Sequence, residues 1–238
     1  MKKSFFIFLI FIICSCNSSS KNNLMIIEGS VLDLRKGTIF LQKYNDSLLV
    51  TIDSIEIKKN GVFKFKTKIN EPEIFHLVLK IDDGDSLNDR ITFFGEKGNI
   101  KIRTRLKTFQ SSVIVQGSKN NDLLEEYKSM SRKFNAKNLE LYRLYLESQK
   151  NQNIAAADSF KIEIDNLLKR RYLYTINFAN TNAEMIVSPY IIVTEGDKIN
   201  PSFLDTIAKK MPINVKKSKY GKSFFKILER NKLELTKE

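Results

Sequence analysis

Apolar and polar residues alternate along the first half of the chain, which is the period of a β-strand with one face in a core. The clearest stretch runs from Val50 to Leu79, where the apolar or threonine positions between Phe63 and Ile69 alternate with lysines. Asn60-Gly61 stands just before them, and these two residue types most easily adopt the positive φ of a type I′ turn. The stretch therefore predicts a β-hairpin plus a third strand, with one aromatic face and one cationic face.

Similar alternation predicts further strands on both sides of this stretch. They are Leu24 to Val31, Thr38 to Lys43, Ile74 to Ile81, Ile91 to Phe94, Asn99 to Arg103 and Val113 to Val115. Gly29 is interpreted as a bulge or a close backbone approach, and the change of apolar parity at Asp53-Ser54 predicts a bulge or bend. Gly95 and Gly98 predict a second hairpin between the strands that flank them.

From Gly117 onward the apolar residues recur at three- and four-residue steps, the period of an amphipathic helix. Asn120 or Asn121 is the predicted cap of a long first helix. This helix breaks at residues 151–153 and returns as a second helix, so the two form a hairpin. Ser188-Pro189 starts a short apolar segment, and further helices are predicted after Asn200-Pro201 and from Val215 to Asn231.

The whole pattern predicts an α+β protein. A β-rich domain, built as an antiparallel β-sandwich or small barrel, occupies residues 24–117, and an α-helical domain occupies residues 118–238. The aromatic side chains on the helices are expected to lie in the core.

The first residues are typical of an export signal. Lys2 and Lys3 precede an unbroken apolar run from Phe5 to Ile13. This run is too short to span a bilayer as a helix, and it has the length of a signal-peptide core. Residues 1–15 are therefore predicted to be a lipoprotein signal peptide.

The sequence Ile13-Cys14-Ser15-Cys16 resembles a bacterial lipobox, with an aliphatic residue three positions before the lipidated cysteine and a small residue directly before it. Cys16 is the predicted lipidation site, because the bulky Ile13 stands directly before Cys14. Residues 16–23 are polar and predict a flexible tether. The alternative is ordinary signal cleavage without lipid. With the lipid, the protein is expected in the cell envelope, anchored to the outer membrane and facing the periplasm.

The two cysteines of the sequence are Cys14 and Cys16. In the lipobox interpretation the first is removed with the signal peptide and the second is acylated. The mature chain then has no free thiol, no disulfide and no CxxC redox pair, although an oxidising compartment would permit one.

The formal net charge is +13, and it falls by two when Lys2 and Lys3 leave with the signal peptide. The remaining cations are spread along the chain, with small clusters at residues 169–171 and 216–217. A nucleic-acid-binding face would concentrate its cations and place aromatic side chains among them, so no nucleic-acid partner is expected. The charge fits contact with anionic lipid or polysaccharide, or simply a solvated surface.

Three groups of residues carry chemistry that a site could use. His76 is the only histidine, and it is interpreted as a satisfied or edge-exposed strand residue, since a zinc site needs further ligands. Asp82 to Asp85 resemble a calcium loop without its later bidentate glutamate, and are interpreted as an acidic turn. Asp53-Ser54 has no general base to take the serine proton. We therefore expect no catalytic, cofactor-binding or metal site, and no cofactor.

Several short motifs occur in an order found in one known family. They are Thr51 to Ser54, Asn60 to Phe65, Glu71 to Glu73, Phe93 to Ile100 and Val115 to Ser118. This order resembles the N-terminal domain of unknown function that precedes thioredoxin-like thiol-disulfide oxidoreductase domains in envelope lipoproteins of Gram-negative bacteria. The helical remainder is similar to the linker of those proteins. The resemblance implies an envelope address and a redox neighbourhood. The printed sequence ends at Glu238, so neither a thioredoxin-like domain nor its catalytic residues are expected in it.

We therefore expect a non-catalytic, lipid-anchored protein of the cell envelope that acts as a binding or interaction module for an unknown ligand, and not an enzyme. One alternative is an accessory subunit of a periplasmic thiol-disulfide oxidoreductase system. Another is a surface lipoprotein that binds glycan or lipid. The expected partners are the membrane, through the N-terminal lipid, and either a thioredoxin-like envelope protein or further copies of the chain in a homo-oligomer.

Overall fold

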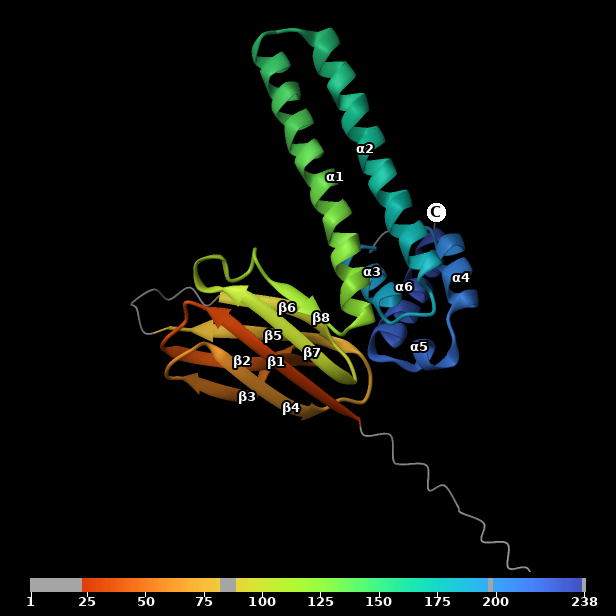
Figure 1. The fold of residues 1–238 in the computed structure, drawn as a ribbon. Helices are drawn as coiled ribbons and strands as arrows, with labels where there is room; N and C mark the ends of the chain where they lie inside the picture. The colour runs from red at the N-terminus through yellow and green to blue at the C-terminus, as the bar shows by residue number, and fades with distance from the viewer. Residues whose placement is uncertain (1–22, 82–88, 197–198, 237–238) are drawn as a thin grey trace, which may run out of the picture.

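The computed structural model describes residues 23–81, 89–196 and 199–236. Two four-stranded sheets come first along the chain and pack face to face, and six α-helices follow them (Figure 1). The α+β fold class predicted from the sequence is confirmed. The β-region is a sandwich of two open sheets and not a closed barrel.

The chain crosses several times from one sheet to the other. Their bounds are β1 (Leu24–Leu32), β2 (Gly37–Asn45), β3 (Leu48–Ile57), β4 (Val62–Lys68), β5 (Glu73–Lys80), β6 (Asp89–Gly95), β7 (Gly98–Arg105) and β8 (Ile114–Gln116). One sheet has the order β4-β1-β7-β8 and the other has the order β3-β2-β5-β6. A short 3₁₀ turn, η1 (Leu106–Thr108), lies between β7 and β8.

The core of the sandwich is aromatic and aliphatic, as the alternation predicts. In β4, Phe63 and Phe65 are buried while Lys64 and Lys66 are exposed. The inner faces of the opposite sheet supply Phe75 and Phe93, whose rings stack with their centroids 6.1 Å apart. Burial of such side chains is the main favourable term in folding, at about 25 cal/mol for each Å² of apolar surface.

The turn at Asn60-Gly61 is present, but the predicted hairpin is wrong. Strand β3 pairs with β2, whereas β4 pairs with β1, so the turn carries the chain from one sheet to the other. Gly61 has φ +62°, and its carbonyl oxygen accepts a hydrogen bond from the N–H of Val31 at 2.9 Å. A turn dipeptide fixes the local backbone and leaves open which strand the next segment pairs with.

The second predicted hairpin, at Gly95 and Gly98, is also wrong. Strand β6 pairs with β5 in one sheet, and β7 pairs with β1 in the other. The β1–β7 pair is parallel, with Ile27 opposite Ile100. A parallel neighbour needs a long crossover, and here the five intervening strands supply it.

Two local predictions hold closely. The register between β2 and β3 shifts between Leu41 and Gln42, which leaves Ile52 as the extra residue of a bulge directly before Asp53. Gly29 is a site of close approach, because a Cβ atom there would lie 2.3 Å from Cζ of Phe63.

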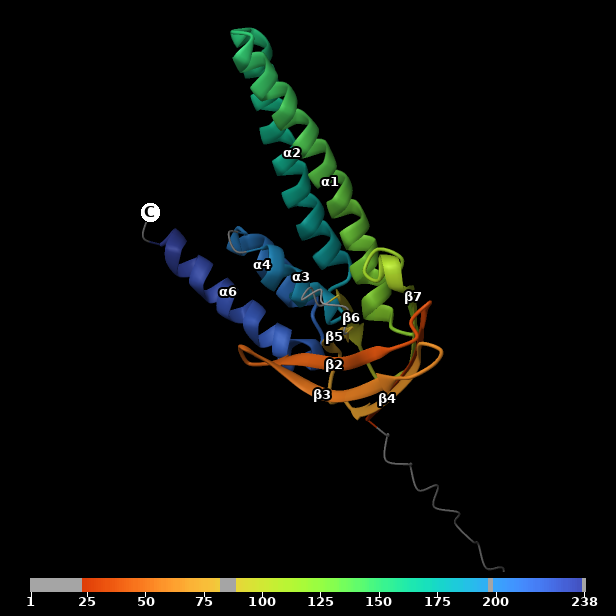
Figure 2. The same ribbon diagram turned by 90° about the vertical axis from the view of Figure 1, so that its left-hand side faces the viewer.

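The helices form a long hairpin and a compact group at its base. Their bounds are α1 (Lys119–Lys150), α2 (Ile154–Thr181), α3 (Val187–Glu195), α4 (Pro201–Lys210), α5 (Ile213–Lys217) and α6 (Lys219–Leu235). The α1–α2 hairpin is confirmed, and it stands clear of the sandwich over most of its length (Figures 1 and 2). At about 1.5 Å per residue, α1 is about 48 Å long.

The helix boundaries follow capping chemistry with two corrections. Ser118, and not Asn120 or Asn121, caps α1, because its side chain accepts the N–H of Asn121. The last predicted helix is divided at Ser218, which caps α6 in the same way. The predicted cap of α4 is confirmed, since Asn200 accepts the N–H of Ser202 at 2.9 Å.

We predict that Gly61→Val lowers the free energy of unfolding by about 1 to 3 kcal/mol, because a β-branched residue resists positive φ. A Cβ atom at Gly61 would also lie 2.1 Å from the carbonyl oxygen of Val31. Gly98→Val is the matched control, because Gly98 has φ +116° and no heavy atom within 4 Å of the added Cβ. Denaturant unfolding should show the larger loss for Gly61→Val; equal losses would mean that the contact with Val31 has no effect.

Candidate functional site

The sandwich and the helices meet at one end of the sheets, where two glutamates bind the starts of two helices. The carboxylate of Glu96, which follows β6, accepts hydrogen bonds from the backbone N–H of Lys119 and from Nδ2 of Asn120, the latter at 2.6 Å. Glu71 accepts the N–H of Lys219 at the start of α6, at 2.8 Å. The first N–H groups of a helix have no partner within the helix and carry partial positive charge. Two carboxylates of the sandwich therefore hold α1 and α6.

Two buried asparagines in the first turn of α1 extend this junction. Oδ1 of Asn121 accepts the N–H of Phe94 in β6 at 3.1 Å, and Oδ1 of Asn120 accepts the N–H of Val187 in α3 at 3.0 Å. Both asparagines are nearly fully buried. The sequence shows two polar residues at the start of an amphipathic helix, which is also the pattern of a cap. Their role as connectors between three elements could not be read from it.

Aromatic side chains fill the space between the sandwich and the helices. Phe94 of β6 contacts Tyr190 and Tyr220 edge to face, with ring centroids 5.2 and 6.0 Å apart. The hydroxyl of Tyr220 accepts the N–H of Ile74 at 3.0 Å. Burial raises the pKa of Tyr190 and that of Tyr220 above the usual value of a tyrosine. Both hydroxyls therefore stay neutral at physiological pH, and that of Tyr220 acts as a hydrogen-bond acceptor.

His76 lies in β5, as expected, but it is neither fully satisfied nor at an edge. It is 6% exposed in an inner strand of its sheet, and Nδ1 lies 3.0 Å from Oγ1 of Thr92. Among the described residues, Nε2 has no hydrogen-bond partner. Burial, and then the positive charge of Arg90, lower the pKa of His76 to about 4. The imidazole is therefore neutral at pH 7, with the Tyr44 ring edge to face at 5.4 Å.

Of the other residues singled out from the sequence, Asp53 and Ser54 are the two that lie in the described part of the chain. Asp53 and Ser54 lie on exposed backbone of β3, where the Ser54 N–H donates to the Asp53 carboxylate at 2.8 Å. Asp82 to Asp85 lie outside the described residues, and so do Cys14 and Cys16. Within residues 23–81, 89–196 and 199–236, no group of three or more His, Cys, Asp or Glu side chains is arranged to hold a metal ion.

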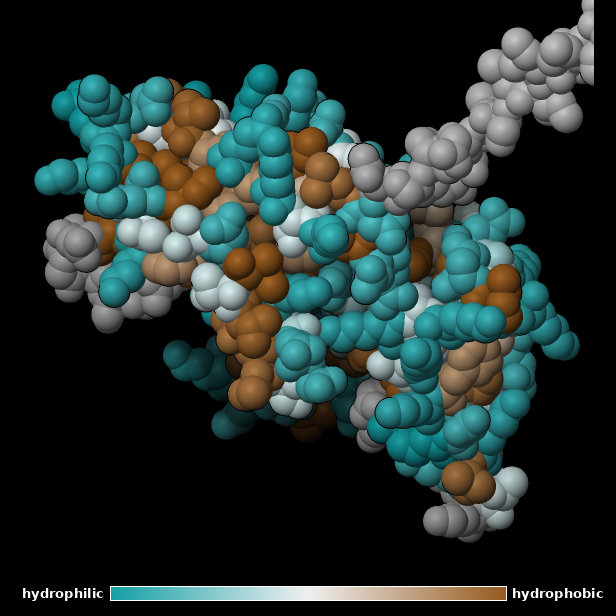
Figure 3. All heavy atoms as spheres, turned by 90° about the horizontal axis from the view of Figure 1, so that it is seen from below, coloured by the Kyte–Doolittle hydropathy of each residue, from teal (hydrophilic) through white to brown (hydrophobic). Residues whose placement is uncertain are grey.

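Apolar side chains reach the surface of the sandwich in several places. Seen from below, they form patches among hydrophilic side chains over the β-region (Figure 3). Leu48 of β3 and Val62 of β4 are exposed, at 73% and 57%. Apolar residues that are exposed singly are normal on a soluble surface, so these positions do not define a site.

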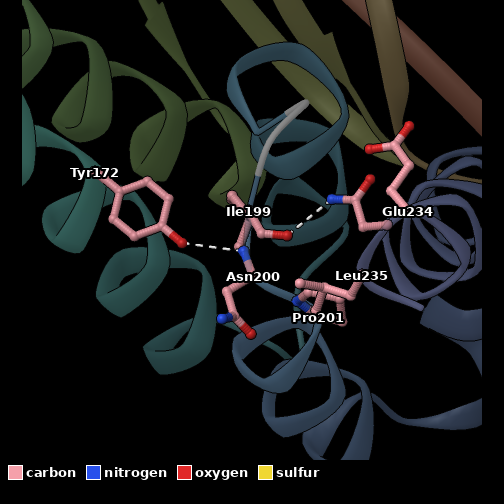
Figure 4. A pocket seen from close by; sticks show the side chains of 7 residues that line it. Tyr172, Ile199, Asn200, Pro201, Glu234 and Leu235 are labelled. Carbon is pink, nitrogen blue, oxygen red and sulfur yellow. Dashed lines mark hydrogen bonds between the residues drawn. The ribbon is translucent and has the colours of Figure 1, made fainter. Parts of the chain in front are cut away.

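A cavity of about 410 Å³ lies between α2, α4 and α6. Its lining residues are Tyr172, Ile199, Asn200, Pro201, Asn231, Glu234 and Leu235. Figure 4 shows Tyr172 pointing from α2 across to Asn200, whose backbone N–H donates to the tyrosine hydroxyl at 3.0 Å. The buried amide of Asn231 donates to the carbonyl oxygen of Ile199 at 2.8 Å. These groups join three helices, and their hydrogen bonds account for their presence without a ligand.

A second cavity, of about 310 Å³, shares Tyr172 and Ile199 with the first. Its charged wall is an ion pair between Arg171 of α2 and Glu195 of α3, at 2.8 Å. Arg171 also donates to Asn135 of α1 at 3.1 Å. The guanidinium thus ties the hairpin to α3, and its charge is already neutralised within the chain.

Comparison with known proteins finds one family model that matches part of the chain. Residues 25–124 match the family model described as Domain of unknown function (DUF4369). The predicted resemblance to an N-terminal domain of unknown function is thereby confirmed. The match covers the whole sandwich and continues into the first turns of α1, so it includes both asparagines of the junction. The curated proteins compared with the chain include no match.

None of the helices in the described part of the chain is both long enough and apolar enough to cross a membrane.

We predict that Glu96→Gln lowers the free energy of unfolding by about 1 to 2 kcal/mol, because the neutral amide loses two charge-assisted hydrogen bonds and turns an N–H group toward Asn120. Glu56→Gln is the matched control. Glu56 forms only an exposed ion pair with Lys58, and such pairs contribute about 0 to 1 kcal/mol. Denaturant unfolding of both variants measures the difference, and an unchanged Glu96→Gln would exclude the carboxylate as a holding group.

We predict that His76 makes stability depend on pH between about 4 and 6.5. Its pKa is lowered in the folded chain, so the unfolded chain binds more protons in this window and stability falls as the pH falls through it. Above pH 6.5 the contribution is constant. The total is about 2 to 3 kcal/mol. His76→Gln removes this titration, so the difference between the wild-type and variant unfolding curves should change with pH only inside the window. A constant difference would contradict the prediction.

Proposed function

We propose that the chain is a lipid-anchored, non-catalytic protein of the cell envelope that acts as an interaction module. The observation that carries the proposal is the N-terminal sequence, in which a short apolar run leads into Ile13-Cys14-Ser15-Cys16. A lipid on Cys16 holds the chain at the outer membrane, facing the periplasm. The polar residues that follow it serve as the tether.

The place where the tether joins the sandwich supports this arrangement. The described chain begins at Asn23, whose carbonyl oxygen accepts the N–H of Ile69 at 2.8 Å, and it enters β1 directly. In Figure 1 this point lies at the lower side of the molecule, and the tip of the α1–α2 hairpin lies at the opposite side. A tether from Cys16 to Asn23 spans at most about 25 Å. The end of the sandwich near Asn23 then stays near the membrane surface.

The α1–α2 hairpin supports the interaction role. Beyond its base, several apolar side chains are exposed on it. They are Leu139, Tyr142, Leu146, Ile154, Ile162, Leu168 and Leu173. Two helices alone can bury only the faces that they turn toward each other, and the apolar positions on their outer faces need a further layer. A projecting element with such faces is suited to binding another protein.

A second candidate is an accessory subunit of a thiol-disulfide oxidoreductase system. The match of residues 25–124 to the domain of unknown function favours it, because the resembling domain precedes thioredoxin-like domains in envelope lipoproteins. Affinity purification of the full chain from detergent-solubilised envelopes distinguishes the two. Recovery of an exported thioredoxin-like protein in stoichiometric amount would favour the accessory role.

We predict that metabolic palmitate labelling of the full chain is lost in Cys16→Ala and kept in Cys14→Ala. The reason is that a small residue, Ser15, stands directly before Cys16, whereas Ile13 stands directly before Cys14. The labelled wild-type chain should sediment with outer-membrane vesicles in a sucrose gradient. Labelling that persists in Cys16→Ala would exclude Cys16 as the lipidation site, and a wild-type chain without label would exclude the anchor.

A further inference from the structure

The two helices of the hairpin differ in how their charged side chains are paired. The charged side chains of α1 pair with one another along the helix, at Lys128–Glu125, Arg132–Glu125, Lys137–Glu140 and Arg143–Glu147. Three of these pairs lie at three- and four-residue steps and neutralise part of the helix surface, whereas the Arg132–Glu125 pair spans seven residues. Other charged side chains of α1, such as Glu126 and Lys133, form no ion pair within the described residues.

The charges of α2 are separated along its length. Its half near the tip carries Asp158, Glu163 and Asp165 with Lys161 among them, and its half near the base carries residues 169–171, all basic. Arg171 is bound to Glu195 and Asn135. The other six of these charged side chains form no ion pair within the described ranges, although Asp165 and Lys169 are one turn apart.

The exposed side of α2 opposite α1 is a continuous ridge. Ile162, Asn166, Lys169 and Leu173 recur at three- and four-residue steps and thus share one face, with Asp165 and Arg170 flanking it. All of these side chains are exposed, Ile162 at 60% and Leu173 at 53%, while Ile164 and Leu167 on the other side of the helix are buried. We call this set of six exposed residues the α2 ridge.

We propose that the α2 ridge binds the α2 ridge of a second copy of the chain, with the two helices antiparallel. In the register that sets Ile162 against the partner's Leu173, Glu163 lies opposite the partner's Arg170, because a twofold antiparallel pair brings the same flank of each helix together and both exposed residues lie on that flank. The same register sets Asn166 opposite the partner's Lys169. Each contact occurs twice because the pair has twofold symmetry.

Charge complementarity is what selects a second copy over another occupant. An antiparallel copy places the acidic half of each α2 against the basic half of the other, and it does so with no change in the fold. A parallel copy would place the two acidic halves together and the two basic halves together, and like charges so close repel each other. The inference rests on the proposed function, in that it names the partner of the interaction module.

The pairing is expected to be weak in dilute solution. One helix pair covers less than the roughly 1,200 to 2,000 Å² of a standard stable interface. Tethering to a membrane raises the local concentration, and this converts a weak contact into a populated one. The two tether attachment points lie at opposite ends of such a pair, so the hairpins lie along the membrane surface when both copies are anchored in it.

The test uses charge reversal on the full chain, purified in detergent, with the mass of the protein component measured by light scattering over a concentration series. Glu163→Lys and Arg170→Glu each create two repulsive contacts, so each should weaken self-association about tenfold or more. An equimolar mixture of the two variants restores attraction at both contacts. It should therefore form a heterodimer about as readily as the wild-type chain pairs with itself.

Asp158→Lys and Lys161→Glu are the matched controls, because they reverse charges on α2 that face no charged side chain of the partner in this register and should leave the association nearly unchanged. Circular dichroism confirms that each variant is folded. As a second readout, Ile162→Cys and Leu173→Cys chains should form a disulfide with each other, mapped by peptide mass spectrometry, and neither should form one with itself at that position.

Two outcomes would overturn the pairing. One is a wild-type chain that stays monomeric at every concentration, and the other is a mixture of Glu163→Lys and Arg170→Glu that fails to associate. Either result leaves palmitate labelling of Cys16 unaffected, so failure of the pairing and failure of the anchor are distinguishable.

Discussion

The arrangement of this protein depends on how the unpaired N–H groups at the starts of two helices are satisfied. These groups cannot find acceptors within their own helices, and at the junction they receive them from the sandwich. Glu96 supplies a carboxylate to α1, and Glu71 supplies one to α6. Both glutamates belong to the same end of the sandwich. The directions of the helices are therefore set by the β-region, and the aromatic contacts of Phe94 then close the space between the two parts.

The sequence was sufficient to predict which segments are strands and helices, but not which strands pair. The alternation of Phe63 and Phe65 with lysines depends on burial of one face, and burial is local enough to be visible in the pattern. Pairing depends on contacts between distant segments. Gly61 has the positive φ that its turn dipeptide predicted, yet the strands on its two sides belong to different sheets. The parallel pairing of β1 with β7 likewise could not be read from the sequence of either strand alone.

At the junction, the roles of two helical side chains could likewise not be predicted from the sequence. Asn120 and Asn121 have the composition of a cap, and a cap was the prediction, but Ser118 takes that role and frees both asparagines to bind Phe94 and Val187. Side-chain amides can serve either purpose, so only the three-dimensional arrangement decides between them. The N-terminal lipobox is different, since it is a pattern in the sequence and requires no fold. The anchor was therefore inferred from sequence alone, whereas the α2 ridge needed the structure to show which charges are already paired.

The position of β1 has a mechanical consequence. Strand β1 is the first element after the tether, and it lies between β4 and β7, with Leu24 paired to Lys68 and Met25 opposite Gly98. A force that pulls the chain from its N-terminal side acts along β1. Because the hydrogen bonds of a sheet run across its strands, that force shears two ladders together and does not open them one bond at a time. Forced unfolding is governed by the unfolding barrier, so the proposed N-terminal anchor would apply its load to a strand that is hydrogen-bonded to neighbours on both sides.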